Sequence, residues 1–164
     1  MKLFATSCVI ASVLVSGAAL GHGSSQAKNP VAQRAGAPVE EKAFGRSGDP
    51  GKASRTIHID MNDEMQYLPN RLRLKVGDTV RFVVRNSGKI MHELVLGTMS
   101  ELKAHAELMR KFPDMEHDEP YMAHVAPGRS ETIFWQFTRP GEFYYGCLVP
   151  GHFEAGMFGR VVVK

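Results

Sequence analysis

Apolar and polar residues alternate along most of the chain after residue 55. Alternation with a period of two is typical of a strand that buries one of its two faces. Segment 79–86 is instead rich in β-branched residues, which predicts a strand that crosses the core. The alternating apolar positions are Ile57, Ile59 and Met61, then Leu72, Leu74 and Val76, and later Ile133, Trp135 and Phe137.

About seven such segments follow one another, joined by short turns, and regular helices between them are absent, which predicts an all-β fold built as an antiparallel β-sandwich. One helical insert interrupts the pattern. We expect Ser100 to cap a helix that continues to Phe112, because Pro113 then ends it. The residues expected to share its buried face are Leu102, His105 or Ala106, Met109 and Phe112.

Residues 1–21 have the composition of a secretory signal peptide, with Lys2 ahead of an uncharged apolar stretch and small residues at Ala19 and Gly21. The stretch is too short and too rich in small residues to span a bilayer. We therefore expect export to the periplasm and no membrane span in the mature form. Residues 22–54 lack periodicity and are rich in Gly, Ala, Ser and Pro, which predicts a flexible arm ahead of one domain, 55–164.

Cysteine usage changes when the signal peptide is removed. Cys8 leaves with it, so the mature chain keeps Cys147 alone and cannot form an internal disulfide. A free thiol in an oxidising compartment needs protection, which metal coordination would supply. A buried, unreactive cysteine is the alternative.

The charge balance gives little information about partners. The full chain has 20 basic and 17 acidic residues, and cleavage of the signal peptide removes only Lys2 from this count. Basic runs interleaved with aromatic residues are absent, so nucleic acid is not a predicted partner. We expect the mature protein to be a monomer.

Cys147, His152 and Met157 are separated from one another by four residues each, with Pro150 and Gly151 to bend the backbone between them. A thiolate, imidazoles and one weak thioether suit a copper ion that changes between Cu(I) and Cu(II), whereas zinc rarely accepts methionine. A trigonal centre with two histidines needs one more imidazole. The candidate is His92, which opens the apolar run that ends at Leu96.

The chain resembles the cupredoxins, a family that includes plastocyanin, pseudoazurin, azurin and auracyanin. The resemblance rests on the Cys-His-Met loop, on the following segment 159–163, and on segments 72–86 and 140–147. It implies a Greek-key β-sandwich that binds one type 1 copper. It also implies that His92, Cys147 and His152 are the strong ligands and that Met157 is the weak axial one.

Glu93 departs from the pattern of several cupredoxins, which have asparagine after the first histidine. Strand alternation turns Glu93 away from the metal if His92 faces it. Its carboxylate would then support the ligands from outside the coordination sphere. Replacement of Met157 as an oxygen ligand is the alternative.

Methionines and histidines are concentrated between residues 91 and 124. Thioethers and imidazoles suit Cu(I), so this segment is a candidate for a second copper site, although core packing is the better explanation for each methionine taken alone. Segment 91–97 and the acidic Met/His loop resemble bacterial periplasmic copper-tolerance cupredoxins. The candidate residues are His105, Met109, Met115, His117, Met122 and His124.

The neighbours of Cys147 argue against an enzyme. Multicopper oxidases place histidines on both sides of this cysteine, whereas here Gly146 and Leu148 flank it. The function that we predict is one-electron transfer chemistry that serves copper tolerance. A dedicated electron carrier between respiratory or photosynthetic partners is the alternative. In either case the resemblance implies that a redox partner docks transiently near His152.

Overall fold

The computed structural model describes residues 39–113, 115 and 118–164. The expected signal peptide and the first part of the expected arm lie outside the described residues. Among the helices in the part that is described, none is long and apolar enough to cross a lipid bilayer.

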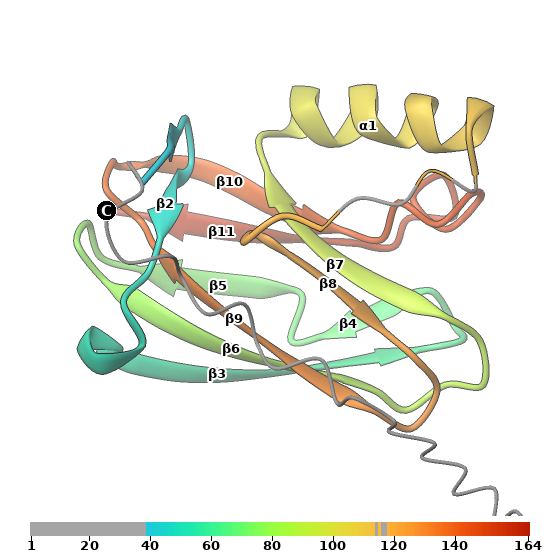
Figure 1. The fold of residues 1–164 in the computed structure, drawn as a ribbon, viewed down its shortest axis with the longest axis horizontal. Helices are drawn as coiled ribbons and strands as arrows, with labels where there is room; N and C mark the ends of the chain where they lie inside the picture. The colour runs from blue at the N-terminus through green and yellow to red at the C-terminus, as the bar shows by residue number, and fades with distance from the viewer. Residues whose placement is uncertain (1–38, 114, 116–117) are drawn as a thin grey trace, which may run out of the picture.

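Two β-sheets face each other, and one helix lies against the outer side of the second sheet (Figure 1). The first sheet has the strand order β1-β2-β9-β6-β3-β4. Its strands are β1 (Glu41–Lys42), β2 (Gly45–Ser47), β3 (Arg55–Asn62), β4 (Gln66–Leu68), β6 (Thr79–Asn86) and β9 (Ser130–Gln136). The second sheet has the order β5-β11-β10-β7-β8. Its strands are β5 (Arg71–Leu74), β7 (His92–Gly97), β8 (Met122–Val125), β10 (Gly141–Gly146) and β11 (Phe158–Val163).

The core lies between the two sheets and confirms the alternating pattern. Ile59, Trp135 and Phe137 are buried there, and Phe82 from the β-branched segment packs edge to face on Phe137. The sandwich is not antiparallel throughout. Strands β3 and β6 pair in parallel, as do β5 and β11. Side-chain alternation is the same in both kinds of pair, so it could not predict strand direction.

The expectation of a flexible arm over residues 22–54 is wrong for the part of it that the structure describes, residues 39–54. Strand β2 pairs antiparallel with β9, and a short 3-10 turn at Pro50–Lys52 follows it. The backbone carbonyl of Phe44 accepts a hydrogen bond of 2.9 Å from Nε1 of Trp135. The ring of Phe44 stacks on Trp135 with 5.1 Å between centroids, so this segment completes the core.

Helix α1 (Met99–Lys111) begins one residue before the expected cap. Thr98 is the N-cap and forms a capping box with Glu101, so Ser100 already lies inside the helix. Its buried residues are Leu102, Ala106 and Met109. Phe112 is 57% exposed, because the helix has ended before it and it no longer shares the buried face.

Candidate metal centre

Two segments that are distant in sequence meet where β10 ends and β7 begins. His92 is the first residue of β7, and Cys147 directly follows β10. Strand β10 pairs with both β7 and β11, so the loop between β10 and β11 lies beside His92. The N–H of Cys147 donates to the carbonyl of Met157 across the neck of this loop, at 3.1 Å. Pairing within the second sheet and this hydrogen bond therefore position the loop beside His92.

His92, Cys147 and His152 bring their donor atoms within 4.8 Å of one another. Sγ of Cys147 lies 3.2 Å from Nδ1 of His152 and 4.0 Å from Nδ1 of His92. The two imidazole rings are 5.0 Å apart between centroids. His92 and Cys147 are fully buried and His152 is partly buried, so the cluster lies just below the surface.

The chemistry of these donors fits copper. Cys147 is a free cysteine, and burial raises the pKa of its thiol to about 12, so a bound metal ion would be needed to displace the proton and give the thiolate. Burial also lowers the pKa of His152, which keeps its imidazole neutral and able to bind a metal. Met157, the expected axial ligand, is 0% exposed on the same loop. A soft thiolate with two imidazoles, and a methionine on the same loop as a candidate fourth ligand, is a donor set that copper prefers.

Glu93 is buried at 2% exposure, and its backbone and side chain are both engaged. Its N–H lies 3.5 Å from Sγ of Cys147. One carboxylate oxygen accepts the N–H of Leu148 at 2.7 Å, and the other lies 3.0 Å from Nδ1 of His124. These contacts favour a supporting role for Glu93 over copper ligation, because they hold its carboxylate against the loop between β10 and β11 and against strand β8.

Asp63 is a neighbour of the cluster that the sequence did not reveal. Its Oδ1 lies 3.1 Å from Nε2 of His92. The residue sits in the connection between β3 and β4, 29 positions before His92. The only local signal was the turn composition around it, which does not indicate a contact with a metal ligand.

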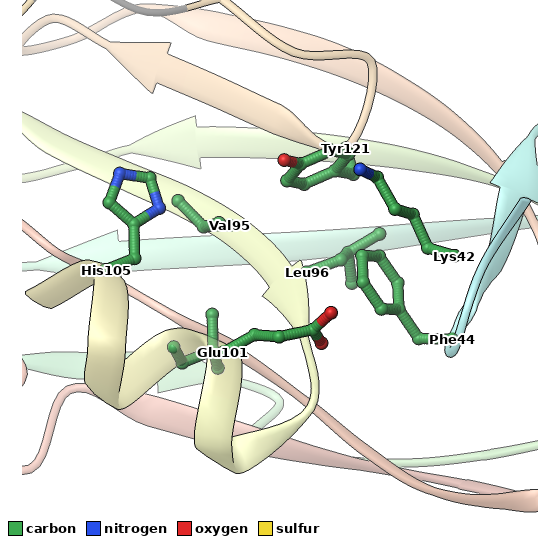
Figure 2. A pocket seen from close by; sticks show the side chains of 8 residues that line it. Lys42, Phe44, Val95, Leu96, Glu101, His105 and Tyr121 are labelled. Carbon is green, nitrogen blue, oxygen red and sulfur yellow. The ribbon is translucent and has the colours of Figure 1, made fainter. Parts of the chain in front are cut away.

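The described candidates for a second copper site lie in more than one environment. Met109 and Met122 are buried in an apolar cluster with Val95, Leu102, Ala106 and Leu148. His105 lines an adjoining cavity of about 90 Å³, together with Lys42, Glu101 and Tyr121 (Figure 2). Val95 and Leu102 belong to both the cavity and the cluster.

The other two candidates in the described part of the chain, Met115 and His124, also have different surroundings. Met115 is 37% exposed in an open groove beyond the helix end. Nδ1 of His124 faces Glu93 at 3.0 Å, and His117 lies outside the described residues. Core packing therefore accounts for two of the candidate methionines, Met109 and Met122.

Residues 53–164 match the family model described as copper binding proteins of the plastocyanin/azurin family. The chain therefore belongs to this family, the cupredoxins, and copper is its cofactor.

Two relatives carry the name copper-resistant cuproprotein CopI. The one from Rubrivivax gelatinosus is 53% identical over 121 residues, which is 74% of this chain and 73% of the relative. The one from Pseudomonas aeruginosa is 30% identical over 156 residues, covering 77% of this chain and 86% of the relative.

Two solved structures share the fold. Reduced auracyanin from Roseiflexus castenholzii has a TM-score of 0.59 at 23% identity, covering 68% of this chain and 98% of that chain. Auracyanin B has a TM-score of 0.58 at 20% identity, covering 78% of this chain and 99% of that chain. The predicted cupredoxin β-sandwich is thereby confirmed.

Proposed function

We propose that the protein binds one copper ion as a type 1 centre and cycles it between Cu(I) and Cu(II). His92, Cys147 and His152 are the strong ligands in this proposal, and Met157 is the weak axial one. The observation that carries it is the gathering of three donor atoms within 4.8 Å of one another, two of them on fully buried side chains. Bound copper supplies the one-electron chemistry.

The protein's part in that chemistry is to hold the ligands still. Each ligand is fixed by backbone pairing or by burial, as for Cys147, whose N–H is bonded to Met157. A site whose ligands cannot rearrange imposes similar positions on both oxidation states, which keeps reorganisation during electron transfer small. We expect a carrier of electrons and copper, not an enzyme with substrate turnover.

In the cell, we propose that this chemistry serves copper tolerance in the periplasm. The proposal is supported by the two relatives named as copper-resistant cuproproteins, one of them 53% identical over most of its length. Export depends on the signal peptide that the sequence predicts at residues 1–21.

A redox partner would dock transiently over His152. Phe158 is 42% exposed and packs on Phe153 with 5.7 Å between ring centroids, which leaves an apolar surface beside the half-buried imidazole. Small apolar surfaces suit weak and short-lived encounters.

The centre is tested by the visible and electron paramagnetic resonance spectra of protein loaded with Cu(II). We expect intense thiolate-to-copper absorption from wild type and its complete loss in Cys147→Ser. The matched control is His58→Ala, which removes an exposed imidazole on β3 and should leave both spectra unchanged. A colourless wild-type protein would overturn the type 1 assignment.

The tolerance role is tested by deleting the gene in its own host and measuring growth across copper concentrations. We expect the deletion to increase copper sensitivity, and wild type but not Cys147→Ser to restore growth. Unchanged sensitivity after deletion would refute the role in tolerance and favour a dedicated electron carrier.

A further inference from the structure

The two ring nitrogens of His92 face different groups. Nδ1 is directed at the thiol of Cys147, 4.0 Å away, and Nε2 at the carboxylate of Asp63, 3.1 Å away. His92 is 0% exposed, so bulk water does not reach either nitrogen. A buried imidazole N–H needs an acceptor, and the carboxylate of Asp63 provides one.

Asp63 is itself held in place by backbone N–H groups of the connection between β6 and β7. Its Oδ2 accepts the N–H of Lys89 at 2.8 Å, and its Oδ1 lies 3.5 Å from the N–H of Ile90. These two contacts hold the carboxylate at the position where it meets the imidazole.

Gly88 makes this approach possible. A Cβ atom at position 88 would lie 2.0 Å from Oδ1 of Asp63 and 2.8 Å from its Cγ, so any other residue would push the carboxylate away. The N–H of Gly88 in turn donates to Oδ1 of Asn86 at 2.8 Å, which fixes the turn. The lack of a side chain at Gly88 therefore leaves the space that the carboxylate of Asp63 occupies beside His92.

We propose that Asp63 is a positioning residue for the copper centre and acts through His92. By accepting Nε2–H it selects the tautomer in which Nδ1 carries the free lone pair, directed at the cysteine. The inference rests on the proposed role of His92 as a copper ligand. Carboxylates that accept a hydrogen bond from a metal-bound histidine fix the ring and increase its basicity.

The negative charge of Asp63 has a second consequence. An anion close to the ligand stabilises the more highly charged oxidation state, so Asp63 favours Cu(II) over Cu(I). The alternative is a purely structural role, in which the carboxylate only joins the two turns on either side of it. The two roles differ in what happens when the charge is removed but the shape is kept.

The test is Asp63→Asn, compared with Asp60→Asn. Asp60 is on β3 and accepts a hydrogen bond of 2.5 Å from the hydroxyl of Ser87, so its variant removes the same charge from a nearby hydrogen-bonded carboxylate. Supporting contacts of metal-bound histidines are typically worth about 10–100-fold in metal affinity. We expect the ratio of Cu(II) to Cu(I) affinity to fall about tenfold in Asp63→Asn, equivalent to a potential about 59 mV higher for a one-electron couple. In Asp60→Asn the logarithm of the same affinity ratio should change by less than about one third as much as in Asp63→Asn.

A second readout needs no metal. Nitrogen-15 NMR of the metal-free protein should show His92 as a single Nε2–H tautomer in wild type and in Asp60→Asn. Asp63→Ala removes the acceptor altogether and should give a mixture of tautomers, whereas the amide oxygen of Asp63→Asn can still accept Nε2–H. Equal affinity ratios in Asp63→Asn and Asp60→Asn, or an unchanged tautomer in Asp63→Ala, would overturn the proposal. If wild type lacks the thiolate absorption, the ligand assignment fails, and the tautomer measurement still decides the role of Asp63.

Discussion

The backbone N–H of Leu148 donates a hydrogen bond of 2.7 Å to the side-chain carboxylate of Glu93. This contact ties the residue after Cys147 to the residue after His92. His92 and Cys147, the two proposed ligands that lie 55 positions apart, are therefore joined through their neighbours as well as by sheet pairing. His124 on the edge strand β8 faces the other oxygen of the same carboxylate.

Removal of this carboxylate should destabilise the metal-free protein. In Glu93→Ala the buried N–H of Leu148 loses its acceptor, and we expect the free energy of unfolding to fall by about 3 kcal/mol. Glu93→Gln keeps an acceptor of similar size and should cost about 1 kcal/mol. Urea unfolding at neutral pH measures both.

His124→Ala is the control for the other contact of the carboxylate. The imidazole of His124 is 39% exposed, so solvent screens its interaction with Glu93 and the loss should be smaller than in Glu93→Ala. A larger loss in His124→Ala would show that Leu148 is the minor partner.

The sequence was most informative where chemistry and spacing coincide. The spacing of Cys147, His152 and Met157 placed three candidate ligands on one loop, and the alternation in β7 correctly turned Glu93 away from His92. Asp63 could not be found in this way, because its contact depends on two turns that meet only in the folded chain. Its partner Gly88 carried only the general signal of a turn.

The fold shows the same limit. Period-two alternation located the long strands, because burial of one face requires it. Strand β2 has three residues, too few for a period to be recognised, and its fixed position depends on Phe44. The sequence also did not indicate the direction of strand pairing, because β3 and β6 present the same alternation of side chains whether they run parallel or antiparallel.

Phe44 should contribute to stability as a core residue does. It is 2% exposed and stacked on Trp135, so Phe44→Ala should lower the free energy of unfolding by about 3–5 kcal/mol. Trp135 is the single tryptophan, and its fluorescence reports both the local change and the unfolding transition. Val39→Ala, at a residue that is 54% exposed, is the control and should change stability by less than about 0.5 kcal/mol. If Phe44→Ala and Val39→Ala are equally stable, Phe44 does not act as a core residue and residues 39–54 form only a peripheral arm.

Met109 and Met122 should behave as packing residues. Both are buried in the apolar cluster between α1 and the second sheet, where leucine conserves volume and apolar character. We expect Met109→Leu and Met122→Leu each to change the free energy of unfolding by less than about 1.5 kcal/mol. Titration with Cu(I) should give the same stoichiometry as wild type. A loss of bound Cu(I) that persists in a Cys147→Ser background would instead establish a second copper site.

Gly88→Ala should disturb His92 without removing any charge. The added Cβ would lie 2.0 Å from Oδ1 of Asp63, so the carboxylate has to leave its position between Lys89 and His92. We expect a loss of about 1–3 kcal/mol in the free energy of unfolding, as for other overpacked sites, together with a mixture of His92 tautomers in the metal-free protein.

Gly51→Ala is the matched control for this substitution. The nearest atom to a Cβ at position 51 is Oδ1 of Asp49 at 3.4 Å, an ordinary contact distance. Thermal unfolding and nitrogen-15 NMR of the two variants measure the difference. Gly88→Ala could instead keep both the stability of the control and a single His92 tautomer. The carboxylate of Asp63 would then reach His92 from another position, and the space at Gly88 would not be needed to hold the imidazole.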